Sequence, residues 1–390
     1  MLHQSEKMDL LTGLPNITYF RSLSQLILDD PEERAKGIAF IYFNVKNFRA
    51  FNYYYGFDAG DRYLIKVSNI IRQAFPEMYV SRFADDHFMV IAYNEELEKR
   101  LDIVRSQTAV QHMSKSMTVK AGIYLVPESG KQNAVRAYDK AKLACESIKD
   151  QLSVGYCYYT DELGERERLK EHIIETIDEA IANNYIKVFY QPIIHVVSGR
   201  LCGYEGLARW VDPEFGFLSP ADFITTLEDA RLIHRLDTYM IHTICQDMQT
   251  CRNKGWTVVP VSVNLSALDF QMADMPIIAK QAIKERDLPN DLLNLEITEA
   301  ALSGKNNDVH EVLERFRSSG FEIWMDNFGS KYSSLNILEE VNVDLLKVDM
   351  RFLKNFHSSS RSRAILKNIM NMAKEIGIRT LMEGVEDEEV

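Results

Sequence analysis

The sequence predicts an α/β protein of two units, in which an α+β domain precedes a barrel-like (β/α) domain. Three observations predict this arrangement. The length of 390 residues is more than one hydrophobic core usually serves. Up to about residue 160, short strand-like runs are separated by helical stretches, and one run turns back on itself. From residue 187 onward, strand-like runs alternate with amphipathic helices, as in a parallel, barrel-like sheet.

The first unit is expected to build a central antiparallel sheet flanked by helices. Its strand-like runs cover residues 37–45, 78–93, 116–126 and 155–160. Ala84, Asp85 and Asp86 interrupt the apolar pattern in the middle of the second run. We therefore expect that run to fold as a β-hairpin.

A helix is expected to join the two units. Apolar side chains recur at helical spacing at Leu169, Ile173, Ile174, Ile177 and Ile181. Gly164 precedes this pattern, so the helix is predicted over residues 165–184. The expected division is a first domain, a connecting helical segment and a second domain, covering residues 1–160, 161–184 and 185–390.

The second unit contains strand-like runs separated by helical stretches. They cover residues 187–194, 201–210, 258–265, 292–298, 322–326, 343–349 and 378–383. These are seven runs, whereas a closed (β/α) barrel normally has eight strands. Because the chain ends at Val390, soon after the last run, we expect a closing strand and helix to be missing.

Charge and composition narrow the possible partners. The net charge of −12, from 45 basic and 57 acidic residues, disfavours broad binding to nucleic acid or an anionic membrane surface. A local basic pocket for one small anionic ligand stays compatible with it. The five cysteines form no CxxC pair, which indicates reduced thiols in a cytoplasmic protein. No apolar run approaches the roughly 20 residues that span a bilayer, so membrane insertion is not expected.

Side chains suited to metal and phosphate chemistry stand near the ends of the runs in the second unit. They are Glu205, Asn264, Glu296, Asp326, Lys347 and Glu383. Since the carboxyl ends of parallel strands meet at one mouth of a barrel, we expect these side chains to converge. Carboxylate and amide oxygens suit Mg²⁺ or Mn²⁺, and a lysine among them can hold a phosphate or a water molecule. One strand-end carboxylate alone is more often a cap, but six such positions together favour a site.

Ordered short motifs in the second unit carry a resemblance to a known family. They are Tyr190-Gln191-Pro192-Ile193, Glu205-Gly206-Leu207, Asn264-Leu265-Ser266, Glu296-Ile297-Thr298-Glu299, Phe328-Gly329, Tyr332-Ser333-Ser334-Leu335, Lys347-Val348-Asp349 and Glu383-Gly384-Val385-Glu386. From about residue 165 to its end, the chain resembles the EAL-type cyclic-di-GMP phosphodiesterase family. The resemblance implies a TIM-like barrel, hydrolysis of cyclic-di-GMP to linear pGpG, and a homodimer formed through the barrel.

The same resemblance implies a role for each matched residue. A first metal ion is held by Glu205, Asn264, Glu296 and Asp326. A second is held by Asp326, Asn327 and Glu383, and catalysis depends on these three residues together with Lys347, which orients the attacking water. The loop that carries Phe328 and Gly329 is braced by Glu299. The dinucleotide is contacted by Gln191, Glu205, Leu207, Arg209 and Asp237.

A departure from the family pattern bears on activity. Asn327 stands where the family has a second aspartate, and Lys331 replaces a glycine of the adjoining loop. Asparagine is neutral and cannot act as a base, so the second metal ion is expected to bind at least about 10–100-fold more weakly. We therefore predict a cyclic-di-GMP receptor with weak or absent hydrolysis. The alternatives are an active metal-dependent phosphodiesterase and a protein-interaction module without the ligand.

The first unit resembles GGDEF-type diguanylate cyclase domains over about residues 5–160. The resemblance is carried by residues 9–20, 52–61 and 82–88. Its nucleotide site departs from the family at several positions. At the hairpin turn, Ala84 and Asp85 stand in place of two glycines, and His87 follows Asp86 where the family has a glutamate. Asn44 replaces a metal-binding aspartate.

Two residues that read guanine in the family are nevertheless retained. They are Asn52 and Asp61. Residual GTP sensing and a plain turn-and-cap role explain them equally well. The first unit is accordingly expected to be regulatory and without cyclase activity.

Overall fold

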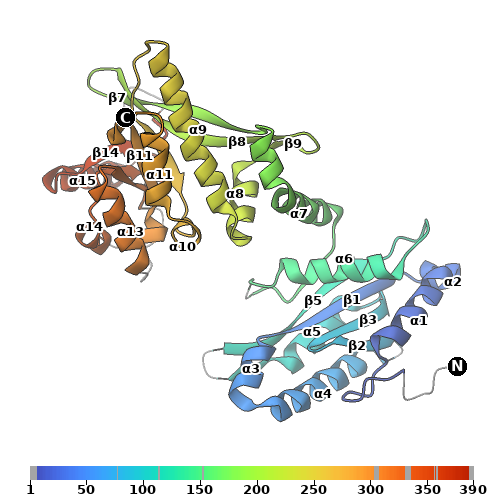
Figure 1. The fold of residues 1–390 in the computed structure, drawn as a ribbon. Helices are drawn as coiled ribbons and strands as arrows, with labels where there is room; N and C mark the ends of the chain where they lie inside the picture. Colours follow the sequence, from blue (N-terminus) through green and yellow to red (C-terminus); the bar gives the residue numbers. More distant parts are fainter. Residues whose placement is uncertain are drawn as a thin grey trace. The chain divides into compact units, whose positions relative to one another are not determined.

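The computed structural model describes residues 7–76, 78–112, 115–151, 153–302, 307–329, 335–354, 356 and 359–385. The chain divides into two compact units, Met1–Arg168 and Leu169–Val390. This division falls inside helix α7 (Asp161–Ala182). Figure 1 labels helices and strands of both units.

The first unit is built on a mixed sheet in the order β2-β3-β1-β5-β4, with β6 added beside β5. Among the strand pairs of the described residues, β5 and β6 run parallel and the others are antiparallel. The predicted hairpin is confirmed, with residues 85 and 86 as its turn. The short β4 was not predicted. The strands are β1 (Ile38–Lys46), β2 (Tyr79–Ala84), β3 (His87–Tyr93), β4 (Val110–His112), β5 (Lys115–Leu125) and β6 (Tyr156–Tyr158).

Helices cover both faces of this sheet. Strand β1 alternates its side chains between the two faces. Ile41 and Phe43 pack with helices α4 and α5, whereas Phe40 packs with helices α1 and α6 on the other face. Figure 1 shows α6 and α4 on opposite sides of the strands. The helices are α1 (Ile17–Asp29), α2 (Pro31–Ala35), α3 (Phe48–Tyr55), α4 (Phe57–Ala74), α5 (Leu97–Thr108) and α6 (Ala134–Ser147).

The second unit contains a curled sheet in the order β14-β13-β12-β11-β10-β8-β7, with β9 beside β8. All seven predicted runs form strands of this sheet. No pairing between β7 and β14 closes it within the described residues, so it is a half-barrel. The strands are β7 (Ile186–His195), β8 (Arg200–Asp212), β9 (Gly216–Leu218), β10 (Val261–Leu265), β11 (Leu293–Thr298), β12 (Glu322–Phe328), β13 (Leu345–Val348) and β14 (Arg379–Met382).

The first strand pair of the half-barrel corrects the expected parallel arrangement. Strands β8 and β10 to β14 pair in parallel, but β7 pairs with β8 in antiparallel register. The physical reason is the loop of residues 196–199, which is long enough for a hairpin and far too short for a parallel crossover.

Helices between the parallel strands complete the second unit. Strand β11 is buried along residues 293–297, as expected for a parallel strand covered on both faces. Buried side chains of α9, α11 and α13, among them Ile244, Ile283 and Phe316, belong to the same core as the strands. No described helix combines the length and the apolar character needed to cross a membrane. The helices are α8 (Pro220–Asp229), α9 (Ile233–Asn253), α10 (Asp269–Met272), α11 (Met275–Lys284), α12 (Glu299–Leu302), α13 (Asn307–Ser318), α14 (Asn336–Glu340) and α15 (Ser360–Glu375), with short 3₁₀ turns at Asn290–Leu292 and Met350–Phe352.

Helix α7 begins at Asp161, the first residue of the expected connecting segment, and Gly164 lies inside the helix instead of preceding it. The backbone N–H of Gly164 donates to the carbonyl of Thr160 at 3.2 Å, which continues the helical pattern. A Cβ atom at this position would overlap the Tyr159 side chain. The glycine is thus explained by close packing, which offsets the roughly 1 kcal/mol that glycine costs within a helix.

Candidate functional site

The ammonium group of Lys347 lies at the centre of a cluster of carboxylates at the carboxyl edge of the half-barrel. Its Nζ atom is 2.6 Å from Glu296 Oε2, 2.8 Å from Glu383 Oε1 and 2.9 Å from Glu205 Oε2. Asp326 Oδ1 lies 3.5 Å from the same nitrogen. The Lys347 side chain is only 2% exposed, so these contacts replace water almost completely. The predicted convergence of strand-end side chains is therefore present around one lysine.

The parallel register explains why residues so far apart in sequence meet. Asn264 on β10 stands opposite Glu296 on β11, and Asp326 on β12 stands opposite Thr298. Because side chains alternate between the faces of a strand, Glu296 and Thr298 point to the same face. Lys347 comes from the end of β13, so neighbouring strands each contribute a group to one edge.

Burial and charge oppose each other in this cluster. Burial disfavours the charged form of Lys347, but the charges of Glu296, Glu205 and Asp326 outweigh it and raise the pKa of the ammonium. Burial raises the pKa of Glu296 to about 7, although Lys347 opposes this shift. The pKa of Asp326 is raised as well, again chiefly by burial. Four carboxyl groups thus face one fixed cation, and the excess of acid favours a further cation or bound protons.

The oxygen atoms of the cluster fit a divalent metal ion in their chemistry. Glu296 Oε1 and Asp326 Oδ1 are both buried without a hydrogen-bond partner, which leaves hard oxygen lone pairs free. Asn264 contributes an amide that donates to Glu205 Oε1 at 3.0 Å. Among the described residues, no three Asp, Glu, His or Cys side chains are already grouped as around a bound ion. The Lys347 ammonium fills the space between the carboxylates instead.

Asn327 interacts directly with the neighbouring carboxylate of Asp326. Its Nδ2 atom donates to Asp326 Oδ2 at 2.5 Å. The Asn327 backbone has φ of 57°, a left-handed conformation that asparagine tolerates better than most residues. The register between β12 and β13 shifts at this point, between Met325 and Phe328. Asn327 therefore gives Asp326 a neutral amide donor at the position where the family resemblance implies a second aspartate.

The loop after β12 is fixed by Glu299, at the start of α12. The Gly329 backbone N–H donates to Glu299 Oε2 at 3.0 Å, and Glu299 is only 4% exposed. Gly329 has φ of 85°, and a Cβ atom there would overlap the Phe352 ring. A glycine is required on both counts. The expectations for Lys331 and for residues 332–334 of the Tyr332-Ser333-Ser334-Leu335 motif lie outside the described residues.

The predicted dinucleotide contacts separate into two groups. Gln191 stands opposite Glu205 in the β7–β8 pair, and Leu207 and Arg209 follow Glu205 at intervals of two residues, so these side chains share a face. The Arg209 guanidinium lies 5.9 Å from the centre of the Phe189 ring.

Asp237 is placed differently from the other predicted ligand contacts. It is 8% exposed on α9 and accepts the backbone N–H of Ser266 at 3.4 Å. The structure places it behind the turn that follows β10. Asp269, also at this turn, is fully buried and was missed in the sequence, because an aspartate at the start of a helix usually indicates only a cap.

In the first unit, the degenerate nucleotide positions interact with one another. Asn44 and His87 face each other across β1 and β3, with Asn44 Nδ2 and His87 Nε2 at 3.1 Å. Asp86 Oδ1 lies 3.6 Å from the same ring nitrogen. The His87 ring also stacks on Tyr42, with a distance of 5.3 Å between ring centres. These contacts leave the histidine as a packed side chain at the end of the hairpin.

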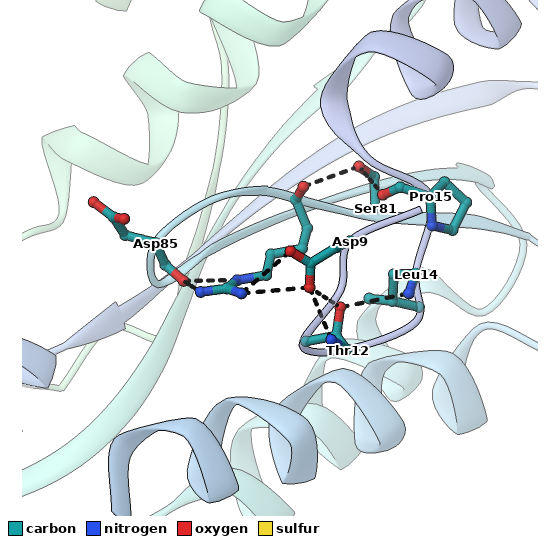
Figure 2. Close-up of polar contacts among 7 residues, drawn as sticks. Asp9, Thr12, Leu14, Pro15, Ser81 and Asp85 are labelled. Carbon is teal, nitrogen blue, oxygen red and sulfur yellow. Dashed lines mark hydrogen bonds and ion pairs between the residues drawn. The ribbon is translucent and has the colours of Figure 1, made fainter. Parts of the chain in front are cut away.

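The hairpin turn is tied to the N-terminal motif by one arginine. Arg82 Nε and Nη2 donate to the Asp85 carbonyl at 2.9 and 2.7 Å, while its Nη1 lies 3.3 Å from Asp9 Oδ2. Figure 2 labels Asp9, Thr12 and Asp85, and its dashed lines mark these contacts. Thr12 donates to Asp9 as well. Although burial opposes it, the contacts with Thr12 and Arg82 hold the pKa of Asp9 below its usual value.

The two positions at which the family resemblance implies guanine contacts differ in exposure. Asn52 Oδ1 is buried without a hydrogen-bond partner and lies against Gly60, where a Cβ atom would overlap it. Asp61 is exposed on α4. A separate cavity of about 850 Å³ opens at the end of β1, and its lining includes Asn44, Lys46 and His87.

The fold and this strand-end cluster define the class of protein, an α/β half-barrel with an acidic site at its carboxyl edge. The profile described as "EAL domain" matches residues 174–390, which is more than half of the chain. The profile described as "Diguanylate cyclase, GGDEF domain" matches residues 6–154. The chain therefore belongs to the EAL domain family and is a tandem GGDEF–EAL protein.

Curated relatives carry the same pair of domains within longer chains. Cyclic di-GMP phosphodiesterase NbdA of Pseudomonas aeruginosa is 30% identical over 99% of this chain and 50% of its own length. Cyclic di-GMP phosphodiesterase PdeR of Escherichia coli is 28% identical over 97% of this chain and 58% of its own length. The chain thus spans about half the length of the curated relatives it matches.

Solved structures share the fold. The PaMucR phosphodiesterase in complex with c-di-GMP is 28% identical, with a TM-score of 0.52 over 56% of this chain and 88% of that one. The S helix-GGDEF-EAL region of Vibrio cholerae LapD, bound to c-di-GMP, is 19% identical, with a TM-score of 0.52 over 99% and 92% of the two chains. The latter likeness concerns the fold alone.

Proposed function

We propose that the second unit binds cyclic-di-GMP at the carboxyl edge of the half-barrel, with weak or absent hydrolysis to pGpG. The observation that carries this proposal is the Lys347 cluster, in which Asn327 supplies an amide to Asp326 in place of a second anion. Relatives named as cyclic di-GMP phosphodiesterases and a neighbour solved in complex with c-di-GMP support the ligand.

The donor set supports Mg²⁺ or Mn²⁺ as the cofactor of this site. Glu205, Asn264, Glu296 and Asp326 would hold a first ion, and Asp326, Asn327 and Glu383 a second. A bound divalent ion supplies an activated water and stabilises the charge of the departing oxygen. Lys347 already has one close carboxylate for each of its three N–H bonds. It can bind a phosphate oxygen only after at least one of these carboxylates moves away.

Asn327 weakens chemistry more than binding. Its side chain carries no negative charge, and its amide nitrogen occupies one oxygen of Asp326. Both effects reduce the attraction of the second position for a cation. The surfaces that would contact the dinucleotide, including Gln191 and Arg209, do not depend on that residue. Binding with little turnover is therefore the outcome that this geometry favours.

The first unit is proposed to be regulatory and without cyclase activity. Asn44 and His87 are engaged with each other, and the Asp85 carbonyl is held by Arg82. A triphosphate approaching the turn would meet the additional carboxylate of Asp85. Binding of GTP without turnover is supported only by the retained Asn52 and Asp61, and titration with GTP tests it directly.

Two measurements separate the candidate functions. Incubation with cyclic-di-GMP and Mn²⁺ is expected to yield little or no pGpG, whereas rapid release of pGpG would establish an active phosphodiesterase. Calorimetry with cyclic-di-GMP and Ca²⁺, which is expected to stall hydrolysis, should give binding heat. Absence of heat at any ligand concentration would instead support a protein-interaction module without the ligand. The proposed homodimer is tested by sedimentation with and without cyclic-di-GMP.

A further inference from the structure

Two buried carboxyl groups meet behind the turn that follows β10. Asp237 on α9 is 8% exposed and Asp269 at the start of α10 is 0% exposed. Their carboxylates converge on a single donor, and two buried carboxylates held this close are stabilised when one of them carries a proton. Both also accept the backbone N–H of Ser266, at 3.4 Å from Asp237 Oδ2 and 2.8 Å from Asp269 Oδ2.

The charged groups around this pair do not neutralise two anions. Glu228 on α8 adds a third carboxylate, which accepts the Ser266 hydroxyl at 2.7 Å. His234 on α9 is the nearby base that attracts Asp269, while Arg315 on the adjoining α13 is engaged with Asp274. Burial raises the pKa of both Asp237 and Asp269, and the charge of Asp269 raises that of Asp237 further.

One carboxylate oxygen of the pair lacks a hydrogen-bond donor. Asp269 Oδ1 is buried and has no hydrogen-bond partner among the N–H and O–H groups of the described residues. A proton carried by Asp237 supplies a donor to its neighbour without any other change. Two ionised carboxylates at this place would instead repel each other away from water.

We propose that Asp237 and Asp269 share one proton and act as positioning residues that fix the β10–α10 turn, and through it the Asn264 amide at the ligand site. Ser266 lies two residues after Asn264, so holding its N–H sets the direction in which the end of β10 leaves the sheet. This inference rests on the proposed binding of cyclic-di-GMP at that edge. It adds a second source of pH dependence to that of Glu296, whose pKa burial raises to about 7.

The direction of the pH dependence follows from proton linkage. The folded protein holds a proton on the pair that the unfolded chain releases above about pH 4. The unfolding free energy contributed by the pair therefore falls as pH rises towards and through the raised pKa. Loss of the proton also places two anions around one Ser266 N–H, so the turn loosens and ligand affinity falls in the same direction.

Substitutions of Asp269 distinguish the effect of the contact between residues 237 and 269 from the effect of the proton that they share. In Asp269→Asn the amide donates to Asp237 and its oxygen accepts Ser266 N–H, so the contact survives without a shared proton. We expect near-wild-type affinity for cyclic-di-GMP in Ca²⁺, with a flatter pH profile between about pH 5 and about pH 9. Asp269→Leu should weaken binding about tenfold, as loss of a residue that orients a ligand-holding group typically does. Asp287→Asn, an exposed carboxylate of the same unit, should keep the wild-type profile.

Infrared spectroscopy of the ligand-free protein gives an independent reading. Because Glu296 can also hold a proton near neutral pH, the spectrum of Asp269→Asn is subtracted from that of the wild type, and the difference should show the carbonyl band of a protonated carboxylic acid. If wild type never binds cyclic-di-GMP, the proposed function fails, but this band and the pH slope of unfolding still test the pair. No such band in the difference spectrum, together with equal pH slopes in wild type and Asp269→Asn, would overturn the inference.

Discussion

The Lys347 ammonium is a single charge that holds several buried acids in place. Carboxylates from different strands approach it, and little water is left to replace it. Breaking a buried ion pair by removing one partner leaves an uncompensated charge. Stability and ligand binding at this edge therefore depend on the same atom.

Replacing that lysine by a neutral side chain of similar length should expose this dependence. We expect Lys347→Met to lower the free energy of unfolding by about 3–5 kcal/mol at neutral pH. Part of the loss should return with Mg²⁺ or Mn²⁺, because a cation again faces the carboxylates. Urea denaturation with and without the ions measures both effects. Lys254→Met, an exposed lysine of the same unit, serves as the control. Equal stability of Lys347→Met and wild type would contradict the expected role.

Restoring an acid at position 327 is the most direct test of impaired chemistry. The left-handed backbone there also tolerates aspartate, so Asn327→Asp is expected to fold normally. The added charge should tighten Mn²⁺ binding by about 10–100-fold and raise the rate of pGpG release sharply. Chromatographic assay of pGpG measures the rate, with Asn253→Asp at the far end of α9 as the matched control. No gain in rate would show that a different defect limits turnover.

At the scale of elements, strand runs were easier to predict than the way they pair. Runs such as residues 292–298 were visible because parallel strands covered on both faces are buried and continuously apolar. The antiparallel β7–β8 pair depends on loop length, and the position of Gly164 inside α7 depends on its contact with Tyr159. The periodicity of apolar residues reports neither how strands pair nor which side chains touch across the fold. A glycine near the start of a helical pattern therefore indicated a helix boundary, although Gly164 lies inside the helix.

The strand-end site was predicted for the same reason that the strands were. Glu296 and Lys347 follow apolar runs directly, so topology alone brings them to one edge. The Asp237 and Asp269 pair could not be predicted in this way, since the two residues lie on different helices and are 32 positions apart in the sequence. Which of two buried aspartates carries a proton is set by packing that no local pattern records.

The loop after β12 offers a prediction about an element and its neighbour. Gly329→Ala should destabilise the protein by about 1–2 kcal/mol through its positive φ and by a further amount, about 1–3 kcal/mol, through overlap with Phe352. Gly377→Ala is the matched control, because φ is 78° there and no atom lies within 4 Å of the added Cβ. Thermal unfolding compares the two. Equal destabilisation would show that the Phe352 contact does not constrain the loop.

At the scale of the whole molecule, two compact units share one chain but carry separate cores. The residues proposed to bind cyclic-di-GMP belong to the second unit alone. Ligand in the presence of Ca²⁺ should therefore slow amide hydrogen exchange in β8, β10 and β11, with β1 and β3 of the first unit unchanged. Mass spectrometry of peptic peptides measures this. Protection in the first unit as well would reveal coupling between the units, and none in the second would contradict the assigned site.

Because all three N–H bonds of Lys347 already face carboxylates, ligand binding at this edge requires that these contacts change. In the ligand-free protein Lys347 acts as an internal competitor, since a cation must displace it from the carboxylates and a phosphate must draw it away from them. The same separation of Lys347 from the carboxylates allows both the cation and the phosphate to bind. Cation and dinucleotide are thus expected to be thermodynamically linked, each strengthening the binding of the other by the same factor.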